Sequence, residues 1–189
     1  MKVGLYFGSF NPIHIGHLII ASHVANHGDV QQVWMVVSPQ NPLKPSSVLL
    51  NEYHRLHLVQ LAVEGNSQLR ASDVEFKLPR PSYTIDTLTY LKEKYPQHEF
   101  SVIMGSDSFQ NLPRWKNFEL LIKNYRFLIY QRPGFPITES YAAKIQILDA
   151  PLLEISATNI RAAIKAGTTT RYLLSDPVRE EIERNGYYK

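Results

Sequence analysis

The sequence predicts an α/β protein built on a doubly wound, mainly parallel sheet with helices on both faces. Apolar, strand-like runs alternate with helix-like segments along the whole chain, which is the order of βαβ units. Turns that carry glycine or serine follow three of the predicted strands, and such turns gather at the ligand-binding edge of an open α/β sheet. A right-handed crossover between parallel strands makes a doubly wound sheet the simplest topology.

The first βαβ unit is the clearest. Residues 2–7 form a short apolar run rich in Val, Leu, Tyr and Phe, which predicts a buried strand. Gly8 then allows a tight turn that a residue with a Cβ could not follow. A helix is predicted at 15–27, where apolar residues recur with helical spacing: Leu18, Ile19, Ile20 and Val24. The apolar run VWMVV predicts the second strand at 33–37.

The next elements keep the same alternation. The Pro-rich segment 38–47 is predicted to be a loop, because its neighbours belong to one βαβ series. An amphipathic helix is predicted at 51–64, and its Arg55 either contacts anions or faces solvent. Further strands are predicted at 70–76, 99–104, 126–130 and 145–148, and further helices at 84–95, 116–124, 158–166 and 177–185. We expect a single domain over 1–189, with the helical part from about 156 to 189 packed on the sheet.

Composition restricts the class of protein. The chain has 20 Lys+Arg, 17 Asp+Glu and a net charge of +3, without a basic run, which argues against a nucleic-acid surface. No apolar run approaches the roughly 20 residues of a membrane helix, and no signal-peptide pattern is present. With 0 Cys, disulfides and thiolate metal sites are excluded. These features favour a cytoplasmic enzyme that has no membrane partner, and they leave open whether it forms a homo-oligomer.

The segment GSFNPIHIGH at 8–17 predicts a phosphate site. His14 and His17 lie three residues apart at the predicted start of a helix and would share one face. Free N–H groups at a helix N-terminus attract anions, and Gly8 allows a close approach to the backbone. A metal pair or two surface histidines are the other interpretations. A metal site would need a third ligand, and no acidic residue accompanies the pair.

A second anion site is predicted at ISATNIR, residues 155–161. Ser156 and Thr158 are both suitable caps for the following helix, whose first N–H groups would be exposed. Arg161 would add a bidentate cation to the same phosphate.

With these two motifs, the chain resembles the HxGH nucleotidyltransferase superfamily, and within it the bacterial nicotinate-mononucleotide adenylyltransferase family. Three further segments extend the resemblance over nearly the whole chain: SYTIDTL at 82–88, GSDSFQNLPRW at 105–115 and YLLSDPVREEIERNGYY at 172–188. The resemblance implies a Rossmann-like nucleotidyltransferase fold. It also implies that ATP and nicotinate mononucleotide react to give deamido-NAD and pyrophosphate, with Mg²⁺ held mainly by the ATP phosphates.

The resemblance also implies roles for particular residues. The catalytic groups would be His14, His17, Lys44 and Arg161, and ATP would contact Gly8, Ser9, Phe10, Gly16, Ser156, Thr158 and Arg161. The loop at 41–44 reads Asn-Pro-Leu-Lys where the family usually has Pro-Pro-His-Lys, so Leu43 replaces an imidazole beside Lys44.

Nicotinate mononucleotide would bind at Thr84, Gly105, Asp107, Trp115 and Lys116. In this family a Trp stacks on the nicotinate ring, and a Thr and a backbone N–H meet its carboxylate. Trp115, Thr84 and the amide near Lys116 are the matching positions, and Asp107 would bind a ribose diol. The simpler interpretations are that Trp115 only packs in the core and that Asp107 caps a helix at 108–112.

Three alternatives stay open. Nicotinamide mononucleotide or, further away, phosphopantetheine would undergo the same chemistry, and an ATP-binding sensor would use the same motifs without turnover. A redox dinucleotide-binding domain is disfavoured, because residues 8–13 read GSFNPI rather than G-x-G-x-x-G.

Overall fold

The computed structural model of the protein describes residues 1–40, 49–151 and 153–189, and it contains one six-stranded sheet. Its strands lie in the order β3-β2-β1-β4-β5-β6, and every neighbouring pair is parallel. Their bounds are β1 Lys2–Gly8, β2 Gln32–Val37, β3 Leu69–Ser72, β4 Glu99–Gly105, β5 Arg126–Tyr130 and β6 Lys144–Leu148. The chain therefore runs outward from β1 on both sides, which confirms the predicted doubly wound fold.

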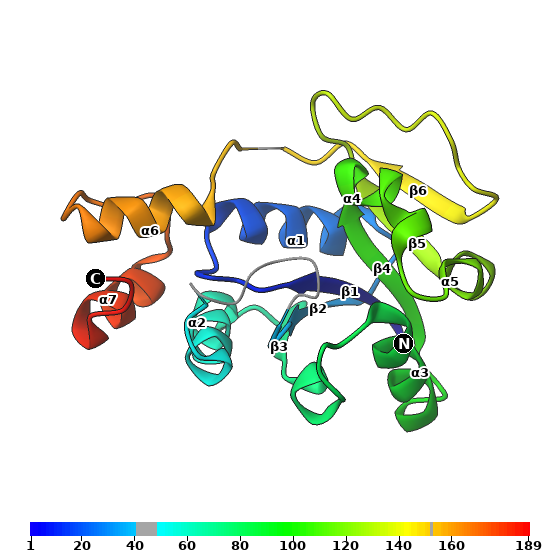
Figure 1. The fold of residues 1–189 in the computed structure, drawn as a ribbon, viewed down its shortest axis with the longest axis horizontal. Helices are drawn as coiled ribbons and strands as arrows, with labels where there is room; N and C mark the ends of the chain where they lie inside the picture. The colour runs from blue at the N-terminus through cyan, green and yellow to red at the C-terminus, as the bar shows by residue number, and fades with distance from the viewer. Residues whose placement is uncertain (41–48, 152) are drawn as a thin grey trace.

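Helices cover both faces of this sheet (Figure 1). One face carries α1 (Ile15–His27) and α2 (Glu52–Val63), and the other carries α3 (Thr84–Lys94), α4 (Ser106–Gln110) and α5 (Phe118–Asn124). The alternation of side chains along β2 separates the two cores, because Val33, Met35 and Val37 join one cluster while Trp34 and Val36 join the other.

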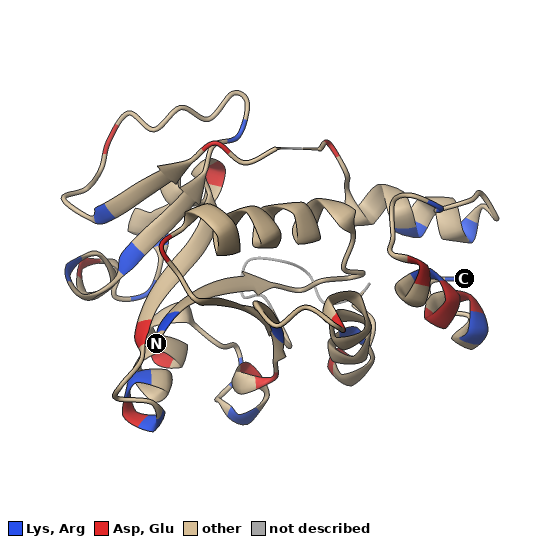
Figure 2. Ribbon diagram, turned by 180° about the vertical axis from the view of Figure 1, so that it is seen from behind, with Lys and Arg blue, Asp and Glu red and all other residues tan. Residues whose placement is uncertain are grey.

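The chain ends with α6 (Ala157–Lys165) and α7 (Asp176–Asn185), which lie near the start of α1 and beside α2 (Figure 1). Their apolar residues, Ile160, Val178 and Ile182, are buried in the same cluster as Leu58 and Val59 of α2. Basic and acidic residues are interspersed on α7 and over the rest of the ribbon (Figure 2). None of the described helices is long and apolar enough to span a bilayer.

Several predicted bounds were wrong. The strand predicted at 70–76 ends at Ser72, and a 3₁₀ helix, η1, follows at Val74–Lys77. There the chain turns inward, so that Val74 and Glu75 are both buried. The helix predicted at 116–124 begins at Phe118. Two short elements were not predicted, α4 and the 3₁₀ helix η2 (Leu112–Arg114), because one or two turns carry too little periodicity to detect.

Candidate active site

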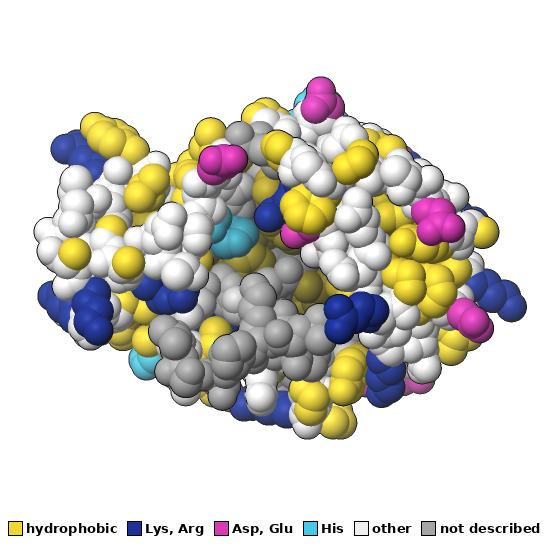
Figure 3. Space-filling model, turned by 45° about the horizontal axis from the view of Figure 1, so that its top comes forward, with side chains coloured by type: hydrophobic (Ala, Val, Ile, Leu, Met, Phe, Trp, Pro, Cys, Tyr) yellow, Lys and Arg dark blue, Asp and Glu magenta, His cyan; other side chains and the backbone are white. Residues whose placement is uncertain are grey.

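The predicted site loops meet at the carboxyl edge of the sheet, between β1 and β4. The order of the strands reverses at β1, and ligands of open α/β sheets bind in the crevice outside such a reversal point. The loop after β1 carries both predicted histidines, and Gly105 and Asp107 follow β4 next to it. Histidine, basic and acidic side chains meet at the hollow in the middle of this face (Figure 3).

His14 and His17 form a stacked pair at the start of α1. His14 is the N-cap residue with extended backbone, and its amide donates to Nδ1 of His17 at 3.3 Å. The two ring centroids lie 3.7 Å apart with an interplanar angle of 27°. Gly16 makes room for this stack, because a Cβ there would lie 3.1 Å from Nδ1 of His14. A side chain at position 16 would therefore push against the His14 ring.

The environment of His14 keeps its imidazole neutral at pH 7. The residue is 7% exposed, and this burial lowers its pKa to about 4. Nδ1 is buried and has no hydrogen-bond partner within the described ranges. A neutral imidazole can still donate one N–H hydrogen bond to an oxyanion. It also avoids the desolvation cost of a buried positive charge.

The loop that leads to these histidines is held by its own aromatic residue. Phe10 has a left-handed backbone, with φ of 44°, and only 2% of its surface is exposed. Its ring covers Gly8, where a Cβ would lie 2.8 Å from the Phe10 Cζ atom. The same ring meets that of His17 edge-on, with centroids 5.1 Å apart. Phe10 thus shapes the loop and supports His17, and Gly8 accommodates its ring.

The ISATNIR segment comes to the same place from the other end of the chain. Arg161 donates from Nη1 to the Asn11 carbonyl at 2.7 Å and from Nη2 to the Thr158 hydroxyl at 3.2 Å. Ser156 is the N-cap residue of α6, although its hydroxyl makes no capping bond, and Thr158 lies inside the first turn. The structure thus brings Arg161, Ser156 and Thr158 next to the loop that precedes His14. The alternative that Thr158 caps α6 was wrong.

The residues predicted to bind the acceptor come from two neighbouring segments. Thr84 is the first residue of α3 and is half-buried. Lys116 reaches the same helix, because its Nζ atom lies 2.8 Å from an Asp86 carboxylate oxygen and 4.8 Å from the centroid of the Tyr83 ring. Trp115 packs against the core beneath and keeps part of its surface exposed. Core packing and partial exposure are therefore both present at Trp115.

Asp107 lies in the first turn of α4, and Gly105 is the N-cap residue, so the prediction that Asp107 caps a helix at 108–112 was wrong. A Cβ on Gly105 would collide with the Asp107 carboxylate, which explains the glycine at the end of β4. One oxygen, Oδ1, is buried without a hydrogen bond in the described part of the chain and lies 3.4 Å from Nε of Arg132. The side chain as a whole is 32% exposed, so its carboxylate can still accept a hydrogen bond from a ligand hydroxyl.

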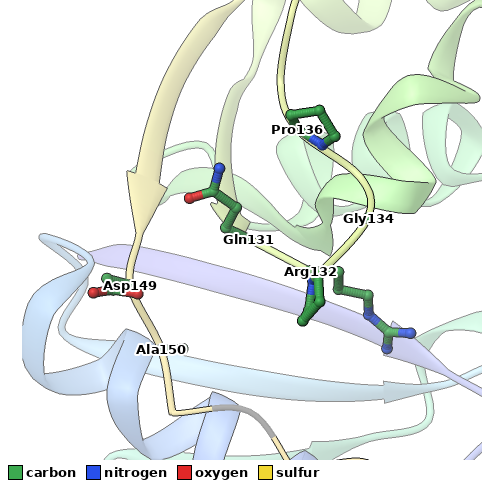
Figure 4. A pocket seen from close by; sticks show the side chains of 7 residues that line it. Gln131, Arg132, Gly134, Pro136, Asp149 and Ala150 are labelled. Atoms are coloured by element: carbon green, nitrogen blue, oxygen red, sulfur yellow. The ribbon is translucent and has the colours of Figure 1, made fainter.

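Arg132 also borders a cavity that the sequence reasoning missed. The cavity is open to solvent and has a volume of about 400 Å³. Figure 4 shows its lining residues at the ends of β5 and β6: Gln131, Arg132, Pro133, Gly134, Pro136, Asp149 and Ala150. The Arg132 amide donates to the Ser106 hydroxyl at 2.8 Å, which joins this cavity to the Asp107 side. The Arg-Pro-Gly sequence directly after a strand was the available signal.

Two further residues hold the site together and were not predicted to do so. Arg55 is completely buried and hydrogen-bonded to backbone carbonyls, so both predictions for it, anion contact and solvent exposure, were wrong. The Asn11 side-chain oxygen accepts from the Leu50 amide at 3.1 Å and from the Tyr188 hydroxyl at 2.9 Å. Lys44 and Leu43 lie outside the described residues.

The described residues contain no group of three or more His, Asp or Glu side chains that could hold a metal ion. The groups that converge near His14 are imidazoles, hydroxyls and a guanidinium, which bind anions rather than hard cations.

Comparison with known proteins gives a consistent result. Residues 5–163 match the family described as cytidylyltransferase-like. A Flavobacterium johnsoniae protein named probable nicotinate-nucleotide adenylyltransferase is 50% identical over 193 residues, with 100% of both chains covered. A Bacteroides fragilis protein of the same name is 44% identical over 182 residues, which cover 96% of this chain and 90% of the relative.

Solved structures share the fold at lower identity. The nicotinic acid mononucleotide adenylyltransferase of Plasmodium falciparum, complexed with NaAD, superposes with a TM-score of 0.82 at 22% identity, and 99% of this chain and 97% of that chain are covered. The same enzyme complexed with APC gives a TM-score of 0.81 at 21% identity.

Proposed function

The chain belongs to the nicotinate-nucleotide adenylyltransferase family of cytidylyltransferase-like proteins, and from this we propose that it transfers the adenylyl group of ATP to nicotinate mononucleotide. The products are deamido-NAD and pyrophosphate, and the reaction is a step of NAD biosynthesis. The observation that supports this most directly is the hydrogen bond from Arg161 to Asn11, which unites the two predicted anion motifs in one site.

The chemistry requires no nucleophile from the protein. A 5′-phosphate oxygen of nicotinate mononucleotide attacks the α-phosphorus of ATP, and the bond from that phosphorus to the bridging oxygen of the β-phosphate breaks. Pyrophosphate leaves with the electron pair of this bond. Catalysis then consists of aligning two polyanions in line and stabilising the charge that develops on the leaving group.

The residues around the start of α1 suit the ATP side. His14 and His17 would donate N–H bonds to phosphate oxygens, and Gly8, Ser9, Phe10 and Gly16 would form the loop under the nucleotide. Arg161 would hold the β- and γ-phosphates with the help of Ser156 and Thr158. Arg161 uses one N–H on Asn11 and one on Thr158, so other N–H groups of its guanidinium are available to phosphate. Lys44 is assigned to the same phosphates on the sequence motif alone.

The residues around α3 and α4 suit the acceptor side. The hydroxyl of Thr84 and the backbone N–H at Lys116 would bind the nicotinate carboxylate, and Trp115 would stack on the ring. Asp107 would accept from the ribose hydroxyls, with Gly105 allowing its approach. A carboxylate accepts charge-assisted bonds that a neutral amide cannot, which favours the acid over the amide as acceptor.

We propose that Mg²⁺ is part of the substrate, bound to the phosphates of ATP. It would neutralise phosphate charge alongside Arg161. We infer that the reaction takes place in the cytoplasm, where ATP is available.

Initial rates of pyrophosphate release test this function. Purified protein is given Mg·ATP with nicotinate mononucleotide, nicotinamide mononucleotide or phosphopantetheine, and the products are identified by mass. We expect deamido-NAD with the acid as the best acceptor. A faster reaction with the amide or with phosphopantetheine would replace the acceptor assignment, and ATP binding without any turnover would identify a sensor instead.

A further inference from the structure

Two buried charged residues outside the proposed substrate contacts hold the two sides of the site, one on the ATP side and one on the acceptor side. We propose that Arg55 and Glu75 are positioning residues: Arg55 fixes the triphosphate loop (residues 8–14), and Glu75 fixes the acceptor segment (residues 82–87). This inference rests on the proposed function, because it assigns the two segments to the two substrates.

Arg55 holds three stretches of backbone that are far apart in sequence. Its Nη1 atom donates to the Ser9 carbonyl at 2.5 Å and to the Ser38 carbonyl at 2.8 Å. Nη2 donates to the Pro39 carbonyl at 3.0 Å, and Nε donates to the Leu50 carbonyl at 2.7 Å. The planar fork of a guanidinium is suited to such divergent bonds, which a single ammonium group could not make in this geometry.

The burial of Arg55 indicates a role beyond packing. None of its surface is exposed, and no carboxylate among the described residues lies within ion-pair distance of it. Burying an unpaired charge is unfavourable, and an apolar side chain would fill the same space more favourably. The compensating bonds all go to loop carbonyls, and two of those loops, after β1 and after β2, open into the crevice. The guanidinium is thus placed where it sets loop geometry.

Glu75 makes the corresponding contacts on the acceptor side. It is 2% exposed, and its two oxygens accept from the Ser82 hydroxyl at 2.8 Å and from the Thr87 hydroxyl at 2.9 Å. These two residues flank Thr84, the proposed partner of the nicotinate carboxylate. Glu75 therefore fixes the turn that presents Thr84 at the start of α3.

Ser38 joins the loop after β2 to the triphosphate loop. Its carbonyl accepts from Arg55, and its amide donates to the Gly8 carbonyl at 2.9 Å. Arg55 and Ser38 therefore hold the loops after β1 and β2 together, while Glu75 holds the start of α3. Because in-line transfer needs the two phosphates at a fixed separation, the placement of each segment has a direct consequence for the rate.

The Arg55 and Glu75 variants should affect different substrates. Loosening Arg55 releases the loop at Ser9, so the KM for ATP should rise and kcat should fall, while the KM for nicotinate mononucleotide stays within about 2-fold. Loosening Glu75 should raise the KM for nicotinate mononucleotide and leave that for ATP nearly unchanged. A displacement on the order of 1 Å in the reacting groups can reduce the rate about 10²-fold.

The experiment compares Arg55→Lys, Arg55→Met and Glu75→Gln with wild type at a temperature where urea unfolding shows all of them to be folded. Arg126→Met is the matched control, because Arg126 also makes side-chain hydrogen bonds, at 3.2 Å to Asp29 and 2.7 Å to Gln146, but lies at the start of β5, on the opposite edge of the sheet. Arg55→Lys keeps the charge and loses the fork, so it should still show most of the loss. If Arg55→Met does not fold, the kinetic constants of Arg55→Lys alone test the role of Arg55.

These measurements distinguish a failure of the positioning role from a failure of the proposed function. We expect a raised KM for ATP in the Arg55 variants, a raised KM for nicotinate mononucleotide in Glu75→Gln, and unchanged constants in Arg126→Met. Equal shifts for both substrates, or changes that follow only the loss of stability, would refute the positioning role. A wild-type protein that does not form deamido-NAD would refute the proposed function instead.

Discussion

The low pKa of His14 makes a quantitative prediction about stability. Burial lowers this pKa from 6.5 to about 4, so the folded protein binds fewer protons at His14 than the unfolded chain does between these two values. Stability therefore falls as the pH falls from 6.5 towards 4. At pH 5 this single group should destabilise the fold by about 2 kcal/mol relative to pH 7 or above, since the unfolded chain takes up the proton almost fully.

Urea unfolding of the wild type and of His14→Asn at pH 7.0 and pH 5.0 measures this loss of stability. Asn is itself a favourable N-cap residue and does not titrate, so the variant keeps the helix start and loses the proton linkage. All other titrating groups are shared, and the difference between the two pH dependences isolates His14. We expect the wild type to lose about 2 kcal/mol more than the variant on acidification. Parallel pH dependences would show that His14 is not buried as described.

Three further changes test other contacts of the site. Gly16→Ala should leave the free energy of unfolding within about 1 kcal/mol of wild type. It should lower kcat, because the new Cβ would lie 3.1 Å from Nδ1 of His14 and displace the ring. A kcat equal to that of the wild type would contradict this. Arg161→Met should reduce kcat/KM for ATP by about 10²-fold or more, measured by pyrophosphate release, and a near-normal value would remove Arg161 from the phosphate site. Thr84→Val should lower the preference for nicotinate over nicotinamide mononucleotide by about 10-fold, and an unchanged ratio of kcat/KM values would exclude Thr84 from recognition of the carboxylate.

The order of the elements was readable from the sequence because β1, β2, β4 and β5 are buried on both faces and therefore form nearly continuous apolar runs. The two predicted anion motifs could be found in the sequence, because each is a short segment that combines polar or basic side chains with the start of a predicted helix. Their meeting in space was expected from the family resemblance, and the hydrogen bond from Arg161 to the Asn11 carbonyl brings them together in the structure.

Long-range side-chain contacts could not be predicted in the same way. Arg55 lies on a helix whose pattern resembles an ordinary amphipathic surface, and nothing within that helix indicates four carbonyl partners in other loops. Glu75 was placed in a strand that ends earlier, at Ser72, so its burial was not evident. Both cases depend on tertiary contacts that a local pattern does not encode.

A crystal structure with an unreactive ATP analogue and Mg²⁺ would show whether the two predicted anion motifs hold one triphosphate. We expect phosphate oxygens within about 3.2 Å of an imidazole nitrogen of the His14–His17 pair and of the Arg161 guanidinium at the same time. A triphosphate bound elsewhere on the molecule, with Arg161 still directed only at Asn11 and Thr158, would contradict it.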